Sequence, residues 1–325
     1  MDRRTWLAAA VGLIAAPRVG DAQAPAKVFR IGLLGGSTPT SPEAGHIWAA
    51  FFQEMRDLGY VEGQNVVFVG RYYGDRIEQL PAFAAELVRL QVDVIVAAAT
   101  PAPETARGAT STIPIVVANH TDPVGSGLAQ SLARPGGNVT GLSLVALELR
   151  LKQLQLLKEI LPGLSRVAFL RHPTIPLDWR ELESAARSLM IRVQMVDARG
   201  PNDFAGAFAA AARERAGAMI VLGGSTFFAN RWRLAELAGR SRLPTVYLLR
   251  EHVEAGGLMA YGVDLRDSFR RAAGYVDKIL KGARPGDLPI ERPTKFELAI
   301  NLRAAKALGL AIPPAVLARA DHLVE

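Results

Sequence analysis

The sequence predicts an α/β protein built as two doubly wound parallel-sheet lobes. Short apolar runs alternate with helical patterns from Lys27 onward, which is the order of elements that a parallel sheet requires. The alternation pauses at residues 122–143, a stretch rich in glycine and small hydroxyl side chains, and then starts again. The chain has 325 residues, a length that corresponds to about two domains.

The first lobe begins with the apolar run 29–34, which ends in two glycines as a buried parallel strand does. A helix is expected over 43–59, where Gly59 ends a helical spacing of apolar residues: Ile47, Phe51, Met55 and Leu58. The same patterns predict the remaining elements, namely strands at 65–73, 92–99 and 113–118 and helices at 77–90 and 102–109.

The second lobe repeats the alternation after residue 143. Its predicted helices lie at 147–163, 178–190, 203–213 and 231–240, and its strands at 165–170, 193–198, 218–224 and 245–249. Residues 256–264 form a further strand that leads into an amphipathic helix at 269–282. One more strand at 293–302 and one more helix at 303–310 complete the pattern.

The N-terminus carries the features of a secretory signal peptide. Arg3 and Arg4 precede the apolar run 7–16, which is too short to span a bilayer, and small residues follow at the spacing that a signal peptidase recognises. The alternative is an ordinary first helix. We predict a signal peptide over residues 1–26 and a periplasmic protein. Cleavage after residue 24 or after residue 26, and the general or the twin-arginine export route, both stay open.

Several classes of function find no support in the sequence. The net charge is +7 without a dense basic run, which disfavours nucleic-acid binding. Cysteine is absent, and the five histidines show no metal-ligand spacing. No dinucleotide-binding, phosphate-loop or nucleophile-elbow motif occurs. We therefore expect no metal, no cofactor and no catalytic residues.

Ligands of doubly wound sheets bind beyond the carboxyl ends of the strands. The predicted strands end in small hydroxyl, acidic and imidazole side chains that could hydrogen-bond a ligand. The candidates for ligand binding are Ser37, Thr38, Thr100, Asp122, His172, Ser225 and Thr226. Ordinary turn and cap chemistry is the alternative role for each of them.

Two long segments carry a family resemblance: DPVGSGLAQSLARPGGNVTGLS at 122–143, and the region from RLPTVYLLREHVEAGGLMAYGVD at 242–264 to the end. They resemble the ABC transporter substrate-binding protein family of the tryptophan/tyrosine type, and the resemblance extends from Arg30 to the C-terminus. It implies a type I periplasmic binding fold with a three-crossing hinge, and a receptor that delivers a small-molecule ligand to an ABC transporter permease. We expect a monomer. The alternatives are an enzyme on a similar two-lobed α/β fold and a ligand sensor for a membrane signalling partner.

The resemblance also implies where the chain crosses between the lobes. The crossings are expected at 138–143, 256–264 and 282–292, with Thr140, Gly141, Gly262 and Asp264 as hinge residues. Ser143 and Tyr261 lie in these crossings and join the ligand-binding candidates. The expected lobes are 27–142 plus 265–284, and 143–264 plus 285–325.

One departure from the family pattern bears on the ligand. Members that bind aromatic amino acids place an aspartate for the ligand amine in the segment after the strand that ends near residue 249. Here Leu249 stands nearest that position, and Arg250 follows it. We therefore predict a small polar ligand, carboxylate-bearing rather than a free amino acid, with Arg250 among the binding residues.

Export predicts a shortened chain. Because the first 26 residues have the succession of a cleaved signal, N-terminal sequencing of periplasmic protein should start after residue 24 or after residue 26. A mature chain that begins at Met1 or Asp2 would contradict this.

Overall fold

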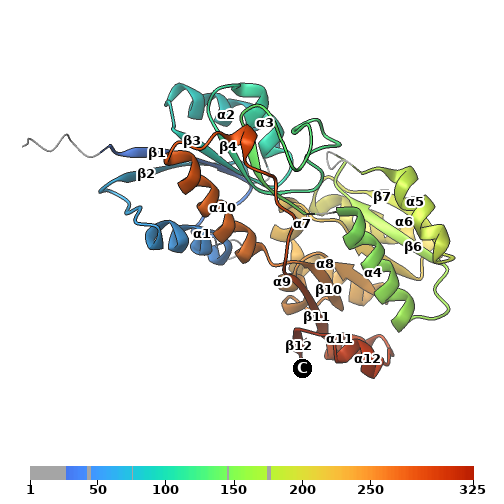
Figure 1. Ribbon diagram of the computed structural model, residues 1–325. Coiled ribbons are helices and arrows are strands. Elements are labelled where there is room, and N and C mark those ends of the chain that lie inside the picture. Colours follow the sequence, from blue (N-terminus) through green and yellow to red (C-terminus); the bar gives the residue numbers. More distant parts are fainter. Residues whose placement is uncertain (1–26, 42–44, 75, 145, 174–176) are drawn as a thin grey trace, which may run out of the picture.

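The computed structural model describes residues 27–41, 45–74, 76–144, 146–173 and 177–325. The signal peptide predicted over residues 1–26 lies outside these ranges and stays a prediction. Helices and strands alternate along the described chain and form two α/β lobes, which lie side by side in Figure 1. The predicted fold class is confirmed.

The first lobe contains a five-stranded parallel sheet in the order β2-β1-β3-β4-β5. Its strands are β1 (Phe29–Gly35), β2 (Val66–Tyr72), β3 (Val94–Ala98), β4 (Ile115–His120) and β5 (Val139–Ser143). Helices cover both faces: α1 (Gly45–Asp57) and α10 (Leu265–Leu280) on one, α2 (Leu80–Arg89) and α3 (Ala102–Ala109) on the other.

The second lobe contains a seven-stranded sheet in the order β12-β11-β10-β9-β8-β6-β7. Its strands are β6 (Arg166–Arg171), β7 (Arg192–Asp197), β8 (Ala218–Val221), β9 (Thr245–Tyr247), β10 (Met259–Val263), β11 (Phe296–Asn301) and β12 (His322–Val324). Strand β11 runs antiparallel to β10, and the other described pairings are parallel.

Helices cover both faces of this sheet as well. One face packs against α4 (Ala146–Ile160), α5 (Trp179–Ser188), α11 (Leu302–Ala307) and α12 (Pro314–Leu317). The other packs against α6 (Pro201–Arg213), α8 (Arg231–Arg240) and α9 (Arg250–Glu254). A short helix, α7 (Ser225–Ala229), follows β8 at the edge that faces the first lobe.

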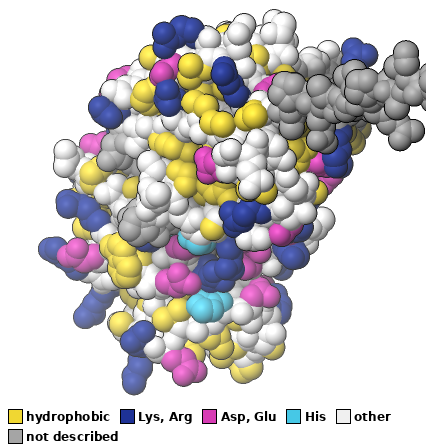
Figure 2. Space-filling view, turned by 90° about the vertical axis from the view of Figure 1, so that its left-hand side faces the viewer, with side chains coloured by type: hydrophobic (Ala, Val, Ile, Leu, Met, Phe, Trp, Pro, Cys, Tyr) yellow, Lys and Arg dark blue, Asp and Glu magenta, His cyan; other side chains and the backbone are white. Residues whose placement is uncertain are grey.

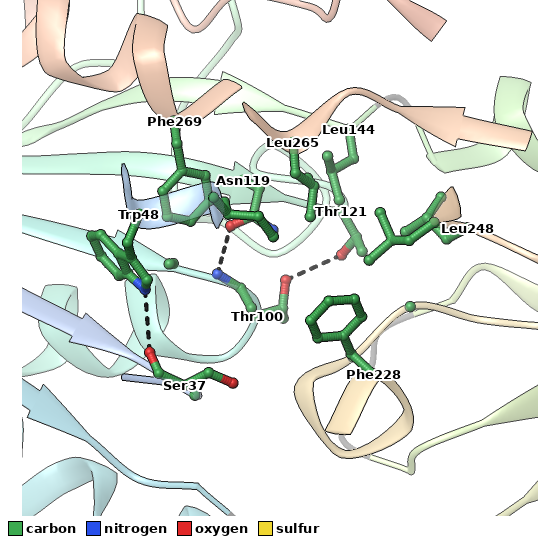
Figure 3. Close-up of a pocket in the computed structure, with 17 residues that line it drawn as sticks. Ser37, Trp48, Thr100, Asn119, Thr121, Leu144, Phe228, Leu248, Leu265 and Phe269 are labelled. Atoms are coloured by element: carbon green, nitrogen blue, oxygen red, sulfur yellow. Dashed lines mark hydrogen bonds between the residues drawn. The ribbon is translucent and has the colours of Figure 1, made fainter. Parts of the chain in front are cut away.

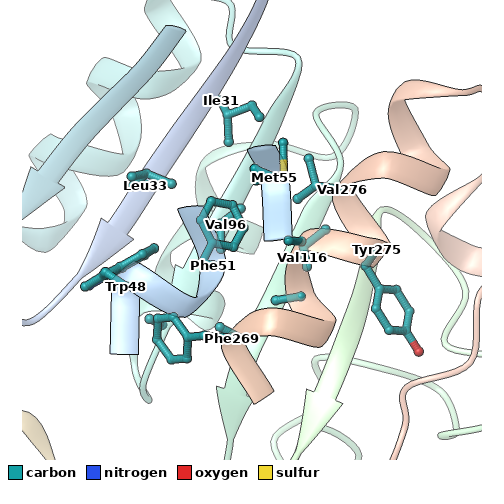
Figure 4. Close-up of a cluster of buried hydrophobic side chains, with 14 of the residues drawn as sticks. Ile31, Leu33, Trp48, Phe51, Met55, Val96, Val116, Phe269, Tyr275 and Val276 are labelled. Carbon is teal, nitrogen blue, oxygen red and sulfur yellow. The ribbon is translucent and has the colours of Figure 1, made fainter. Parts of the chain in front are cut away.

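Helix α10 belongs to the first lobe although it follows β10 of the second. Its apolar face lies against α1, as Figures 1 and 4 show. Phe269 of α10 meets Trp48 of α1 edge to face, with 4.9 Å between the ring centroids. Phe51 and Met55 complete this buried cluster. Aromatic pairs of this geometry add about 0.5–1.5 kcal/mol beyond burial, so the first lobe is complete only once the chain has returned to it.

Two of the predicted hinge residues lie in a strand of the first lobe. Thr140 and Gly141, predicted as hinge residues, lie inside β5 and pair with Val116 and Val117 of β4. Gly141 has φ +132, and a Cβ at this position would strike the backbone of Val117. The absence of a side chain at residue 141 therefore allows β5 to lie close to β4. These contacts favour a first crossing that begins after Ser143, which remains a proposal.

The other two crossings are short. Gly262 is in β10, and Asp264 caps α10 by accepting from the backbone of Arg266 at 2.9 Å. Beyond α10, the turn at Pro285–Asp287 and residues up to Glu291 follow β5 of the first lobe. The backbone N–H of Glu291 donates to Gly141 at 2.9 Å. These contacts favour assigning 285–291 to the first lobe, whereas the sequence analysis gave them to the second; the lobe boundaries remain a proposal.

The surface charges are mixed in sign. On the face drawn in Figure 2, Lys and Arg side chains are interspersed with Asp and Glu, and no single basic patch stands out. None of the helices in the described ranges combines the length and the apolar character that a membrane span needs.

Arg150 of α4 is a buried charge without a hydrogen-bond or ion-pair partner in the described part of the chain. The residue is 3% exposed, and its Nε and Nη1 find no acceptor there. Burial lowers the pKa of this guanidinium to about 10. One turn later, Gln153 donates to the backbone oxygen of Tyr261 at 2.7 Å. An unpaired buried charge costs free energy that an apolar side chain does not.

We therefore expect Arg150→Met to raise the free energy of unfolding by about 1–4 kcal/mol in urea denaturation. Arg187→Met in α5 is the control, because Arg187 is exposed and pairs with Glu183 along the helix. It should change stability by no more than about 0.5 kcal/mol. A less stable Arg150→Met protein would show that the guanidinium contributes to folding.

Candidate functional site

A pocket lies where the carboxyl ends of the two sheets meet. The first lobe contributes residues that follow β1, β3, β4 and β5, and the second contributes residues that follow β8 and β9. The cavity volume is about 110 Å³. Its position is the one that doubly wound sheets use for ligands, and its walls come from both lobes (Figure 3).

The walls are largely apolar. Trp48 and Phe269 line the side of the first lobe, and Phe228 of α7 stands opposite them (Figure 3). Aliphatic side chains fill the space between the aromatic rings: Ile47, Leu144, Leu248, Leu249 and Leu265. The indole Nε1 of Trp48 donates to the backbone oxygen of Ser37 at 3.2 Å, which fixes the ring. The pocket therefore suits a ligand with an apolar, planar body.

The polar groups gather at the ends of β3 and β4. Oδ1 of Asn119 accepts from the backbone N–H of Ala99 at 2.8 Å, at a residue with φ +63. This contact orients the amide of Asn119. The NH₂ group of the same amide has no acceptor among the described residues. The hydroxyls of Thr100 and Thr121 lie 3.4 Å apart. Because each hydroxyl carries one hydrogen, one hydrogen of the pair remains for a ligand. The polar end of the pocket thus presents hydrogen-bond donors.

The described residues that line the pocket include no charged side chain. Its polar members are Ser37, Thr100, Asn119 and Thr121, and the remaining lining residues are apolar or glycine. No group of acidic and histidine side chains in the described ranges could hold a metal ion. A ligand charge in this pocket would therefore meet neutral dipoles instead of an ion-pair partner.

The structure brings only part of the predicted site together. Ser37 and Thr100 line the pocket. Ser225 opens α7 directly after the pocket residues Gly223 and Gly224, but its side chain lies outside the described set. Thr38 pairs with the exposed Thr40 at 3.2 Å and is not among the lining residues.

The other candidates lie elsewhere. Oδ1 of Asp122 accepts from the backbone of Gly125 at 2.8 Å, which makes it a turn residue. Ser143 is buried at the end of β5. His172 and Thr226 line a separate groove, and Tyr261 stacks on Phe296 with 6.1 Å between ring centroids.

Arg250 was predicted to face an anionic ligand, and the structure gives it other partners. Its guanidinium lies 3.2 Å from Glu254 and 3.8 Å from Glu297. It lines a small polar cavity next to the pocket, and not the pocket itself. Two carboxylates already compensate this charge, so the arginine is not free for a ligand in this conformation.

The sequence analysis missed the aromatic walls. Trp48 and Phe269 recur at helical spacing with core residues, and nothing in that spacing separates a pocket wall from a core side chain. Asn119 and Thr121 were within reach, since they follow the predicted fourth strand at the same sheet edge as Thr100. The position after a strand is therefore a signal that could have identified both residues.

Comparisons with known proteins fit this geometry. The family model of the ABC transporter substrate binding protein matches residues 43–324. A curated protein from Clostridioides difficile, named tyrosine-binding protein, is 24% identical over 266 residues, which is 80% of this chain and 75% of that protein.

Two solved structures resemble this one in fold. The first is an ABC domain from Streptococcus pneumoniae in complex with L-Trp, with a TM-score of 0.83, 24% identity and coverage of 92% of this chain and 100% of that one. The second is a conserved domain protein from Vibrio cholerae, with a TM-score of 0.84, 29% identity and coverage of 91% and 100%.

The amide of Asn119 shapes this site, and its removal should be measurable. Asn119→Ala leaves the N–H of Ala99 without an acceptor, so we expect it to lower the free energy of unfolding by about 1–3 kcal/mol in urea denaturation. Thr38→Ala, which loses only an exposed contact, should change it by less than about 0.5 kcal/mol. Equal effects of the two substitutions would mean that Asn119 does not hold the turn.

Proposed function

Because the chain belongs to the ABC transporter substrate-binding protein family, we propose that it is an exported receptor that captures a small ligand between its lobes and delivers it to an ABC permease. The family is one of binding proteins, and no enzyme activity is proposed. Export rests on the signal-peptide pattern of residues 1–26, and delivery rests on family membership. We propose a monomer that contacts a small molecule and a permease, without a nucleic-acid partner.

The observation that carries the ligand proposal is that the described lining residues of the pocket are uncharged. Trp48, Phe228 and Phe269 favour an aromatic body of the ligand. The free NH₂ of Asn119 and the hydroxyls at Thr100 and Thr121 favour a polar end that accepts hydrogen bonds. We infer a ligand with an apolar, planar body and a carboxylate or carboxamide end. The proposed ligand is more apolar than the sequence predicts, and Arg250 is not among its partners, because Glu254 and Glu297 hold that guanidinium.

An ammonium group fits this lining poorly. A buried cation without a carboxylate or carbonyl partner is costly, and none of the described lining residues is acidic. The names of the relatives favour a second candidate, since one is called tyrosine-binding and another was solved with L-Trp. An aromatic amino acid shares the ring and the carboxylate with the ligand proposed here, and differs by its ammonium group.

Four indole compounds separate the two candidates by calorimetry: indole-3-acetate, indole-3-acetamide, tryptamine and L-tryptophan. We expect the acetate and the acetamide to bind, and tryptamine and tryptophan to bind at least about tenfold more weakly, since an unpaired buried polar group costs about 1–3 kcal/mol. Submicromolar binding of tryptophan would establish the second candidate instead.

The variant Asn119→Asp tests whether Asn119 binds the polar end of the ligand. It keeps an oxygen for the N–H of Ala99 and replaces the free NH₂ with a second carboxylate oxygen. We expect it to lose indole-3-acetate and to gain affinity for tryptamine, because the donor has become an anionic acceptor. Thr38→Val outside the pocket is the control and should bind all four compounds as the parent does. Unchanged acetate binding by Asn119→Asp would place the polar end elsewhere.

A further inference from the structure

His120 is a fully buried histidine at the end of β4, between two residues that line the pocket. Asn119 and Thr121 are pocket residues, whereas His120 is 0% exposed and is not among the described lining residues. Side chains along an extended strand point alternately to its two sides. The imidazole of His120 is therefore directed away from the pocket, and there it meets Glu104 of α3.

Both ring nitrogens of His120 are hydrogen-bonded. Nδ1 accepts from the backbone N–H of Asp122 at 3.1 Å, and Nε2 lies 2.6 Å from Oε1 of Glu104 in the first turn of α3. A backbone N–H can only donate, so Nδ1 carries no hydrogen in this arrangement, and the hydrogen of the neutral ring is on Nε2. The imidazole therefore accepts from the loop after β4 and donates to α3.

These contacts join segments that border the polar end of the pocket. Helix α3 begins directly after the turn that contains the pocket residues Ala99 and Thr100. The backbone oxygen of His120 also accepts from the N–H of Leu144, another pocket residue, at 2.8 Å. One buried residue thus contacts the chain that follows β3, the loop that follows β4 and the segment that follows β5.

The donors of the pocket depend on how these turns are spaced. Oδ1 of Asn119 accepts from the N–H of Ala99 at 2.8 Å, and the hydroxyls of Thr100 and Thr121 lie 3.4 Å apart (Figure 3). A hydrogen bond between hydroxyls is ordinarily about 2.7–2.8 Å long, so a small shift between the turns would separate the two threonines. The contact between His120 and Glu104 links the same two segments from the side away from the pocket.

We propose that His120 is a positioning residue that fixes the spacing between the turns after β3 and β4. Its bonds to Glu104 and Asp122 hold the pocket donors in place for the ligand, and its own side chain does not touch the ligand. The inference rests on the proposed function, because these donors are the groups that meet the polar end of the ligand. A contact that only stabilised the first lobe as a whole would not affect these turns selectively.

Two substitutions separate the two ring contacts in the ligand-free protein. His120→Asn offers an oxygen near the position of Nδ1 but cannot reach Glu104. His120→Gln keeps a donor near the position of Nε2 but loses the acceptor for Asp122. Hydrogen exchange measured by NMR should show the N–H of Asp122 exchanging about tenfold faster in His120→Gln only, and the N–H of Ala99 about tenfold faster in His120→Asn only.

Tyr60→Phe is the control, because it removes another buried hydrogen bond from the first lobe. The hydroxyl of Tyr60 donates to Oδ1 of Asp277 at 3.0 Å, and its loss should leave the exchange of both amides as in the parent protein. Unchanged exchange of Ala99 and Asp122 in the two His120 variants would overturn the proposal. An equal acceleration of amides throughout β1 to β5 would also overturn it, since this is the result of a general loss of stability.

Calorimetry with indole-3-acetate measures the consequence for binding. We expect both His120 variants to bind this compound at least about fivefold more weakly, and Tyr60→Phe to bind it as the parent does, because only the His120 variants displace the donors. Binding by both His120 variants at the parent affinity would contradict the positioning role. If the parent protein binds none of the indole compounds, the proposed function fails, while the exchange of Ala99 and Asp122 still decides the role of His120.

Discussion

The structure depends on one constraint: the carboxyl ends of two parallel sheets must face each other. Strands of a parallel sheet end at the same edge, so every loop that follows a strand reaches this edge. Residues as distant in sequence as Ser37, Asn119 and Leu248 meet there for that reason. Helix α10 connects the two edges, because it follows β10 of the second lobe, starts beside the pocket and then packs on α1 of the first lobe.

The fold was predictable because its signals are local and repeated. Strand and helix patterns alternate strictly, and most predicted elements lie within a few residues of the observed ones. The role of Gly141 was harder to predict, because a glycine in a sequence has two possible roles. A glycine can absorb hinge rotation, or it can let two strands approach closely, and only the neighbouring carbonyl of Val117 decides between them. That carbonyl is a tertiary contact, and no pattern within residues 138–143 reports it.

The site was predictable only in its location. The rule about strand ends found Ser37 and Thr100, but it could not tell which hydroxyls face the cavity. Thr38 is the next residue after Ser37 and lies outside. The aromatic walls were not predicted, because the side chains of Trp48 and Phe269 belong to the core and to the pocket lining at once. An amphipathic pattern states that a face is apolar, and it does not state whether a ligand touches it.

The distribution of charge separates ligand recognition from the stabilisation of the lobes. Arginine and glutamate side chains line the small polar cavity beside the pocket, but no charged side chain among the described residues lines the pocket itself. Arg250 shows why: its charge is held by Glu254 and Glu297 inside the second lobe, so it stabilises that lobe instead of the ligand. A ligand is then selected by shape and by donors such as Asn119, which do not depend on pH.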